Sequence, residues 1–364
     1  MEKENFNKMK NKKNKFTTLI NSTNLTNSNN YIRNEINAKK YDEYRRLWEK
    51  ASNLELVTNF PLQLDFELNY SCNFSCENCT WSTESKEGKG KNTWFPFELF
   101  KEIIDEAIPK GLKSIRLNYL NEVLMRKDVD KFIKYARDAG ILDIYLTTNG
   151  SLLTKNMSKK LIKSGLMRLK ISLDATTKET FDKIRKGGNF EKILKNIDNF
   201  IELKKKMKSM LPTISVNFVK TNINKHELDD FILQWENKVD SIGIQNLIDI
   251  MNKTENITKK TFNCNQPFIH LTIRYDGTVL PCCSFFGAEI PIALLKSEYP
   301  LSNIDNIGLL DKLYKGKLVM QSIEEIWNGE KMCEYREMHK KGEYWKNKVC
   351  KKCIDSSFNV DDTF

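Results

Sequence analysis

From Pro61 onward, the hydrophobic positions of the chain alternate between two kinds of pattern. Short runs with apolar residues at alternate positions predict strands, and longer runs with apolar residues three and four apart predict amphipathic helices. The predicted strands are Gln63–Leu68, Ser114–Tyr119, Asp143–Thr148, Leu169–Asp174, Thr213–Val219 and Ser241–Leu247. The predicted helices lie near Phe97–Ile108, Val129–Ala139, Asn156–Ser164, Phe190–Met207 and Lys225–Trp235. This alternation predicts a parallel α/β sheet. Because a closed barrel needs eight units, six predict an open, partial (β/α)6 barrel.

The flanking segments do not follow this alternation. Residues 1–40 are rich in Lys and Asn and lack apolar periodicity, so we expect a disordered N-terminal extension. Tyr41–Ala51 predicts a short helix within a lead-in over residues 41–60, and the barrel is expected over 61–253. After residue 253 the pattern changes, and Asp276-Gly277 between two apolar runs predicts a β-hairpin. Residues 254–364 are therefore expected to form a small α+β domain, with helices near Ile323–Met332 and Lys331–Lys341.

Composition changes this picture little. The chain has 364 residues and a formal net charge of +11, without one basic stripe in which aromatic residues are interleaved. We interpret the charge as a Lys-rich, solvated surface and do not expect a nucleic-acid partner. No apolar run is long enough for a membrane span, and the polar N-terminus does not resemble a secretory signal, so we expect a cytoplasmic protein.

Nine cysteines carry the candidate chemistry, and their odd number argues against a disulfide framework. Cys72, Cys76 and Cys79 follow the first predicted strand with C-x3-C-x2-C spacing. Thiolates are soft ligands for iron–sulfur clusters, zinc or copper(I). Three thiolates on a four-iron cluster leave one iron without a protein ligand, whereas structural zinc requires four ligands, and no fourth Cys or His lies nearby in the sequence.

The loops after the other predicted strands bring polar groups to the same edge of the sheet. In α/β folds the chemistry lies at the C-terminal ends of the strands. The groups expected there are Asn121-Glu122, Thr148-Asn149-Gly150, Asp174-Ala175-Thr176 and Gln245-Asn246.

The three-cysteine loop after the first strand of a six-unit α/β chain resembles the radical S-adenosylmethionine (SAM) superfamily. The resemblance implies a TIM-like partial barrel in which Cys72, Cys76 and Cys79 hold a [4Fe–4S] cluster. SAM would bind the open iron and be cleaved reductively to a 5′-deoxyadenosyl radical, which abstracts hydrogen from a substrate C–H bond. Two positions depart from the family: Asn78 stands where an aromatic residue is usual, and Leu120-Asn121-Glu122 stands in place of Gly-Gly-Glu.

The resemblance also implies roles for the polar groups at the strand ends. Glu122 would bind the amino group of the methionine moiety, although it can also be read as a solvated loop carboxylate. The ribose and the carboxylate of SAM would contact Ser172, Asn149 and Asp174. The resemblance implies that Arg185 lies near the methionine carboxylate, although Arg185 can also be read as a solvated helix-end cation. It also implies that Ile244 and Gln245 lie beside the adenine, and the alternative is that they are core residues of a strand.

The second cysteine group resembles the SPASM auxiliary-cluster domain. Cys264, twelve residues, Gly277, four residues and Cys282 match its opening, and Cys350-x2-Cys353 matches its next pair. Later cysteine positions of the full domain are Asn359 and Thr363 here. The resemblance therefore implies the shortened Twitch form, with one auxiliary [4Fe–4S] cluster on Cys264, Cys282, Cys350 and Cys353. A four-cysteine zinc site is the alternative.

Cys283 and Cys333 remain outside both sets. Either is a buried small hydrophobic residue or a catalytic thiol that returns a hydrogen atom to a substrate radical. Cys283 follows a predicted cluster ligand and is also an alternative ligand.

The single auxiliary cluster resembles that of radical sugar and aminocyclitol dehydrogenases, and Tyr44–Phe74 resembles enzymes of carbohydrate biosynthesis. We therefore expect an oxidoreductase that dehydrogenates an alcohol of a small-molecule or carrier-linked substrate, with the auxiliary cluster as electron acceptor. A flavodoxin- or ferredoxin-type protein would donate electrons. The alternatives are a peptide maturase, for which residues 1–60 are too polar and too short to supply a leader-binding domain, a radical epimerase, and a non-catalytic metal-bearing binding protein.

Overall fold

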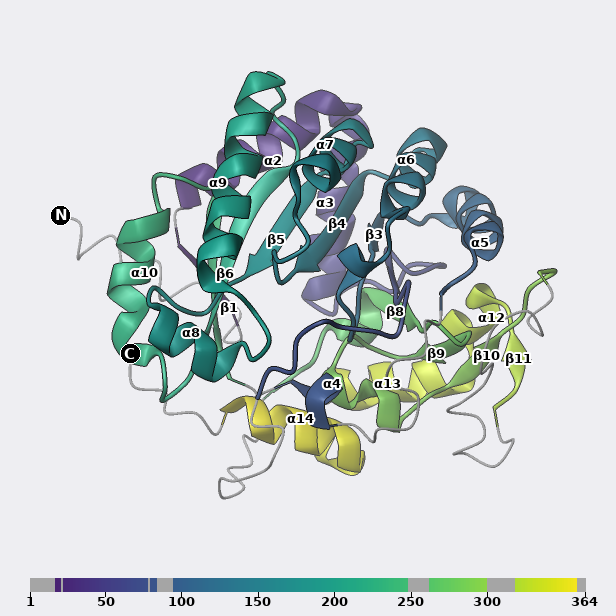
Figure 1. Cartoon of the computed structure of the whole chain (residues 1–364). Coiled ribbons are helices and arrows are strands. Elements are labelled where there is room, and N and C mark those ends of the chain that lie inside the picture. The colour runs from purple at the N-terminus through teal and green to yellow at the C-terminus, as the bar shows by residue number, and fades with distance from the viewer. Residues whose placement is uncertain are drawn as a thin grey trace.

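The computed structural model shows one curved sheet with helices packed around it (Figure 1). The structure describes residues 17–20, 22–77, 79–83, 94–247, 262–299 and 318–358. Among these residues, eleven strands form one sheet in the order β1-β7-β6-β5-β4-β3-β2-β8-β9-β10-β11.

Six consecutive parallel strands form the partial barrel, which confirms the predicted α/β fold. They pair in sequence order from β2 to β7. Their bounds are β2 Gln63–Phe66, β3 Ser114–Arg116, β4 Asp143–Thr148, β5 Arg168–Ser172, β6 Thr213–Lys220 and β7 Ser241–Asn246. The barrel is open because β7 pairs with β1 and β2 pairs with β8, instead of with each other.

Helices between these strands cover the outer face of the barrel, as the amphipathic patterns predict. Their bounds are α5 Phe97–Lys110, α6 Val129–Ala139, α7 Lys155–Lys163, α8 Lys178–Ile184, α9 Phe190–Lys206 and α10 Leu228–Trp235. Thr154 and Asn189 cap α7 and α9 by accepting backbone N–H hydrogen bonds. Helix α8 was not predicted from the sequence, because seven residues are too few to show a helical period.

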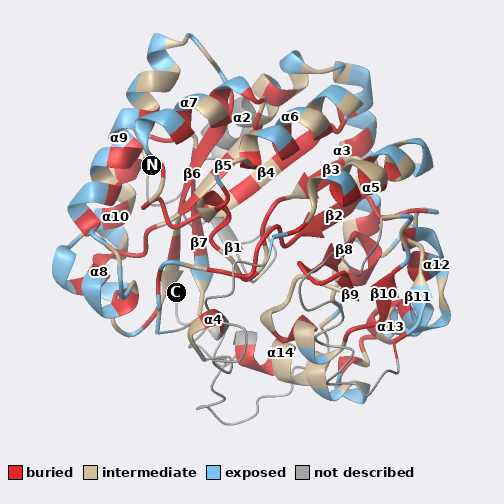
Figure 2. Ribbon diagram, turned by 45° about the vertical axis from the view of Figure 1, so that its right-hand side comes forward, coloured by how far each residue is buried: buried red, intermediate tan, exposed pale blue. Residues whose placement is uncertain are grey.

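The strands alternate between the helices and the barrel interior. On β5, Leu169 and Ile171 are fully buried in the main hydrophobic core, whereas Arg168, Lys170 and Ser172 line the interior. Figure 2 shows the buried strands enclosed by helices whose outer faces are exposed. The apolar face therefore holds the helices in place, and the opposite face leaves polar side chains for chemistry.

The N-terminal region differs from the prediction. Residues 1–16 lie outside the described residues, but β1 (Thr17–Ile20) pairs antiparallel with β7, and α2 (Ser22–Glu35) and α3 (Ala38–Ser52) follow. The expectation of disorder up to residue 40 is therefore wrong for most of 17–40. Strand β1 satisfies backbone groups at the edge of β7, a tertiary contact that polar composition does not reveal.

The C-terminal region extends the barrel sheet. Strand β8 (His270–Ile273) pairs parallel with β2, and the predicted hairpin joins it to β9 (Thr278–Leu280), with Gly277 at a φ of +80°. The remaining elements are β10 Ala293–Leu295, β11 Met320–Gln321, α12 Ile323–Asn328, α13 Glu330–Lys340 and α14 Lys348–Phe358. The predicted linker at 254–260 lies outside the described residues.

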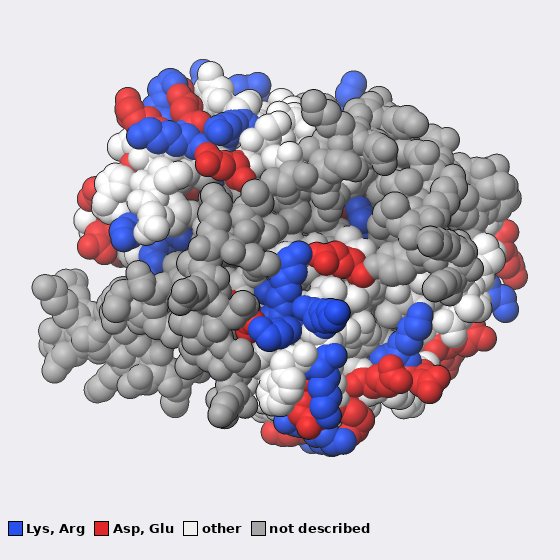
Figure 3. All heavy atoms as spheres, turned by 90° about the horizontal axis from the view of Figure 1, so that it is seen from below, with Lys and Arg blue, Asp and Glu red and all other residues white. Residues whose placement is uncertain are grey.

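The described surface carries charges of both signs. In Figure 3, which views the molecule from below, Lys and Arg side chains lie beside Asp and Glu side chains. No helix in the part of the chain that the structure describes is long and apolar enough to cross a membrane.

Candidate active site

The three-cysteine loop follows β2 and opens onto a cavity of about 720 Å³ inside the barrel. Cys72, Cys76 and Cys79 all line this cavity. The segment after α8 supports the loop: the backbone N–H of Ser75 donates to the Lys186 carbonyl oxygen at 2.9 Å. At Gly187 a Cβ atom would lie 3.3 Å from the Asn73 carbonyl oxygen, and the φ of +93° itself favours glycine.

The chemistry of the loop fits an iron–sulfur cluster. Burial, with smaller contributions from Glu122 and the neighbouring thiols, raises the pKa of Cys72 to about 12. Burial also raises the pKa of Cys79. Clustered buried thiols become thiolates when metal cations replace their protons. Arg185 Nη1 lies 3.9 Å from Cys76 Sγ and supplies a further positive charge beside the thiols.

Glu122 connects the loops after three barrel strands. Its buried carboxylate accepts hydrogen bonds from the Thr148 hydroxyl and the Asn149 N–H, both at 2.7 Å, and from the Leu124 N–H at 3.0 Å. Its own N–H donates to the Ser71 carbonyl oxygen at 2.9 Å. Burial raises the pKa of Glu122 despite these donors. The carboxylate lines the cavity and still has acceptor capacity, so it is not merely a solvated loop group.

Asn149 and Ser172 both line the cavity but differ in their freedom. The Asn149 amide donates to Asn73 Oδ1 at 3.0 Å and accepts from the Ser151 hydroxyl at 2.7 Å, so it stabilises the rim. Ser172 ends β5, and its hydroxyl group forms no hydrogen bond with any residue that the structure describes. Of these two predicted contacts, Ser172 is the group that is free to bind a ligand.

Asp174 and Arg185 form a buried ion pair at the cavity wall. Asp174 Oδ1 also accepts from the Val219 N–H at 2.8 Å. Burial alone would lower the pKa of Arg185, but the Asp174 carboxylate and the Cys76 sulfur together outweigh this effect, and the pKa rises. The structure therefore contradicts the reading of Arg185 as a solvated cation. The Arg185 Nε atom is buried and has no hydrogen-bond partner among the described residues.

The two predicted adenine neighbours on β7 separate. Gln245 lines the cavity, whereas Ile244 is buried in the main hydrophobic core. Of the two readings left open for Ile244, the structure supports the core strand residue, because adjacent strand residues face opposite sides of a sheet. Asn78 lies outside the described residues.

The auxiliary cysteines come from three separate segments. Cys264 precedes the short 3-10 helix Gln266–Phe268, Cys282 follows β9, and α14 carries Cys350 and Cys353. Burial is the main cause that raises the pKa of Cys264, and the neighbouring thiols of Cys353, Cys350 and Cys283 raise it further.

Burial raises the pKa of the auxiliary thiols, to about 12 for Cys350 and about 11 for Cys353. Ser284 Oγ lies 3.0 Å from Cys353 Sγ. The convergence of Cys264, Cys350 and Cys353, with Cys282 near Cys353, gives a donor set that fits a fully protein-ligated cluster.

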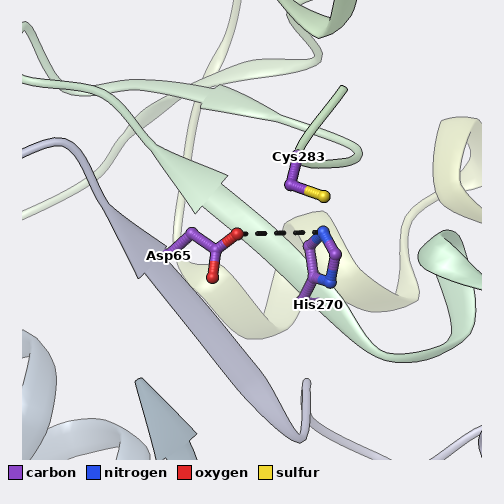
Figure 4. A group of neighbouring side chains, drawn as sticks. All are labelled: Asp65, His270 and Cys283. Atoms are coloured by element: carbon purple, nitrogen blue, oxygen red, sulfur yellow. Dashed lines mark ion pairs between the residues drawn. The ribbon is translucent and has the colours of Figure 1, made fainter. Parts of the chain in front are cut away.

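Cys283 lies in a group that the sequence analysis did not assemble. Its Sγ, an oxygen of Asp65 and a ring nitrogen of His270 all lie within 4.8 Å of one another (Figure 4). His270 Nε2 is 3.9 Å from Asp65 Oδ2, which is itself 2.6 Å from Arg116 Nη2, and the His270 and Asp65 side chains are both buried. Burial favours the neutral thiol, but His270 and Arg116 together outweigh this effect and lower the pKa of Cys283.

The sequence held one weak signal for this group. Asp65 and His270 are polar residues within otherwise apolar runs, which form β2 and β8, but only the pairing of β2 with β8 brings them together. Cys283 itself lines the cavity. Cys333 is an exposed residue of α13 and does not line this cavity. The structure therefore supports neither its prediction as a buried hydrophobic residue nor its prediction as a catalytic thiol in the cavity.

Comparisons with known proteins agree with this geometry. Residues 66–232 match the radical SAM superfamily, and residues 264–354 match the SPASM iron–sulfur cluster-binding domain. The chain is 36% identical over 160 residues to "GTP 3',8-cyclase" of Aliarcobacter butzleri, covering 42% of this chain and 48% of that protein. It is also 36% identical over 143 residues to "AdoMet-dependent heme synthase" of Methanosarcina barkeri, covering 39% of this chain and 40% of that protein. The chain thus spans about half the length, or less, of these curated relatives.

Solved structures show the same fold at low sequence identity. BtrN in complex with AdoMet and 2-DOIA has a TM-score of 0.51 and 16% identity, covering 84% of this chain and 98% of that chain. Native anSMEcpe with bound AdoMet has a TM-score of 0.52 and 16% identity, covering 82% and 92%. These matches, the thiol-lined cavity and the two family regions show that the chain belongs to the radical SAM superfamily, with a C-terminal SPASM-type domain, and binds SAM and [4Fe–4S] clusters.

Proposed function

We propose that this chain dehydrogenates an alcohol carbon of a sugar- or aminocyclitol-type substrate inside the barrel. The observation that carries the proposal is the position of the auxiliary segment at the radical cavity. Cys283 and Phe285, which follow the auxiliary ligand Cys282, line the same cavity as Cys72 and Cys76. A substrate there would lie between the site where a radical arises and a group that accepts an electron.

The cofactors supply the radical chemistry. When bound, the reduced [4Fe–4S] cluster at Cys72, Cys76 and Cys79 together with SAM provides a 5′-deoxyadenosyl radical. A cluster on the auxiliary cysteines provides a one-electron acceptor. Loss of one hydrogen atom, one proton and one electron from a carbinol group gives a ketone, so the product is two hydrogens lighter than the substrate.

The protein's own side chains orient the reactants. Glu122 and Ser172 offer acceptor and hydroxyl groups at the C-terminal ends of the strands, and the Asp174–Arg185 pair fixes the rim beside Cys76. Trp81 also lines the cavity, and its ring packs edge-to-face against the buried Tyr70. The buried Trp81 ring would shield this rim from water. Such enclosure protects a reactive radical from side reactions.

The test uses the anaerobically reconstituted full chain with a flavodoxin- or ferredoxin-type electron donor, which we also propose as its partner. A panel of sugar phosphates, nucleotide sugars and aminocyclitols is incubated with SAM, and 5′-deoxyadenosine and product mass are measured. A ketone formed in step with 5′-deoxyadenosine supports the proposal. The proposal would be contradicted if no 5′-deoxyadenosine formed, either with any compound of the panel or without an added compound.

One observation favours epimerisation as a second candidate function. The Cys283 thiol faces the cavity and is held beside His270, so it is placed to return a hydrogen atom to a substrate radical. The reaction would convert the thiol into a thiyl radical. One electron from the proposed flavodoxin- or ferredoxin-type donor and one proton from water would restore the thiol.

Solvent deuterium separates the two functions. In D2O, epimerisation places deuterium at one carbon without changing the oxidation state, and Cys283→Ala abolishes that exchange while 5′-deoxyadenosine still forms. Dehydrogenation gives a ketone in both proteins. A ketone as the sole product of wild type and Cys283→Ala would exclude the epimerase.

A further inference from the structure

The cavity continues from the cysteine loop into the middle of the barrel, where its lining is strongly polar. Arg116 on β3, Tyr145 on β4 and Lys170 on β5 face this part of the cavity. Lys170 is one inward-facing position before Ser172 on the same strand. At the rise of a strand, this places its Cα about 7 Å further from the rim at which SAM binds.

Two of the three cations here are neutralised by the protein. Arg116 Nη2 lies 2.6 Å from Asp65 Oδ2, and Arg168 Nε lies 2.9 Å from Asp143 Oδ1. Lys170 forms no ion pair with any carboxylate among the residues that the structure describes. Its nearest recorded partner is the Tyr145 ring, whose centroid lies 4.8 Å from the Lys170 Nζ.

The surroundings of Lys170 leave an excess of positive charge. Burial, Arg168 and Arg116 together lower the pKa of Lys170 to about 8, outweighing the opposite effect of Asp143 and Asp65. An ammonium group out of bulk water without a carboxylate partner destabilises a fold. Because Lys170 opens onto a cavity large enough for a small-molecule ligand, an anionic ligand is the natural partner for its charge.

We propose that Lys170 binds an anionic group of the substrate, a phosphate or a carboxylate, in the middle of the barrel below the cysteine loop. This inference rests on the proposed function, because it assumes that the substrate of that reaction enters this cavity. It makes the substrate a charged derivative, such as a phosphorylated or nucleotide-linked sugar or a sugar acid. Arg116 is held by Asp65, so Lys170 is the side chain that distinguishes charged from neutral substrates.

The test measures the thermal unfolding of the reconstituted full chain at pH 7 with methyl phosphate, acetate or chloride at constant ionic strength. Wild type, Lys170→Met and Lys170→Arg are compared with the matched control Lys195→Met, a change of an exposed lysine on α9. We expect one of the two anions to raise the Tm of wild type, Lys170→Arg and the control by about 3 °C relative to chloride. Lys170→Met should show no such shift.

The outcomes separate the two anion chemistries and the two proposals. A shift with methyl phosphate alone identifies a phosphorylated substrate, and one with acetate alone identifies a carboxylate. An equal shift in Lys170→Met, or no shift in wild type, overturns the inference. If Lys170→Met does not fold, Lys170→Gln replaces it. SAM cleavage is assayed in the same preparations. An anion effect without 5′-deoxyadenosine would defeat the proposed function and leave the anion site standing.

Discussion

The two cysteine groups of this chain are built in opposite ways. Cys72, Cys76 and Cys79 lie within one loop and line the reaction cavity directly. Cys264, Cys282, Cys350 and Cys353 come from three segments. They meet only because the hairpin β8–β9 extends the barrel sheet and α14 packs against the 3-10 helices Phe285–Glu289 and Tyr344–Lys346. A local site requires little more than a short loop, whereas a dispersed site forms only when the whole domain has folded.

The difference also bears on chemistry. Three local thiols provide three ligands, which leaves one iron of a four-iron cluster open to SAM. Four dispersed thiols provide a complete set, which suits electron transfer. The following predictions test whether the two groups have these separate roles.

Replacing a cysteine of the local group should have the largest effect. We expect Cys76→Ala to reduce 5′-deoxyadenosine formation to the background level, because SAM loses its iron site. Iron content should fall from about eight to about four per chain, since one of two four-iron clusters is lost. Iron and sulfide assays on anaerobically reconstituted protein, with SAM cleavage measured in parallel, check this result. Retained SAM cleavage would remove the assigned role of this loop.

Replacing a cysteine of the dispersed group should separate cleavage from oxidation. We expect Cys350→Ala also to contain about four iron atoms per chain. It should still form 5′-deoxyadenosine but no ketone, because the electron has no acceptor. Cys333→Ala is the matched control, since Cys333 is exposed on α13 and should leave both products unchanged. Ketone formation by Cys350→Ala at the wild-type rate would contradict an acceptor role for this site.

The loop's support should contribute to stability. Asp174→Asn removes the charge that neutralises the buried Arg185, and we expect it to reduce the free energy of unfolding by about 3 kcal/mol. Urea denaturation of both proteins measures the difference. Asp182→Asn is the control, because the Lys178–Asp182 pair is exposed to solvent. Equal unfolding midpoints for all three proteins would show that the Asp174–Arg185 pair does not support the loop.

The smallest effect should appear at the dispersed site. Ser284 Oγ lies 3.0 Å from Cys353 Sγ and would donate to the sulfur once it is a metal-bound thiolate. Removing this hydrogen bond in Ser284→Ala should lower the reduction potential of the auxiliary cluster by about 40 mV, equivalent to about 1 kcal/mol for one electron. Redox titration followed by electron paramagnetic resonance measures the shift. A shift at the other cluster instead would reverse the assignment.

Much of the barrel was predictable because its signals are local. Strand β4 and helix α6 have the bounds that the hydrophobic pattern predicts, and the other barrel strands differ by a few residues at their ends. The N-terminal segment could not be predicted in the same way. Its composition is polar, and β1 exists only because β7 offers an unpaired edge.

The candidate site likewise has features that could be predicted from the sequence and features that could not. Its polar rim was predictable because parallel strands end at one edge, which brings Glu122 and Ser172 to the cavity of the cysteine loop. Which of these groups are free was not predictable. Asn149 hydrogen-bonds to the side chains of Asn73 and Ser151, and Arg185 pairs with Asp174. Within the part of the chain that the structure describes, the Ser172 side chain forms no hydrogen bond.

The cysteine spacing, the parallel order of the strands and the superfamily could be read from the sequence, because these depend on residues close together in the chain. The relations between distant segments appeared only in the folded molecule. It grouped Cys283 with His270 and Asp65, excluded Cys333 from the cavity and left Lys170 without a carboxylate among the described residues. The physical reason is that pairing and burial depend on which side chains meet across strands β2, β5 and β8, and a local pattern does not specify those contacts.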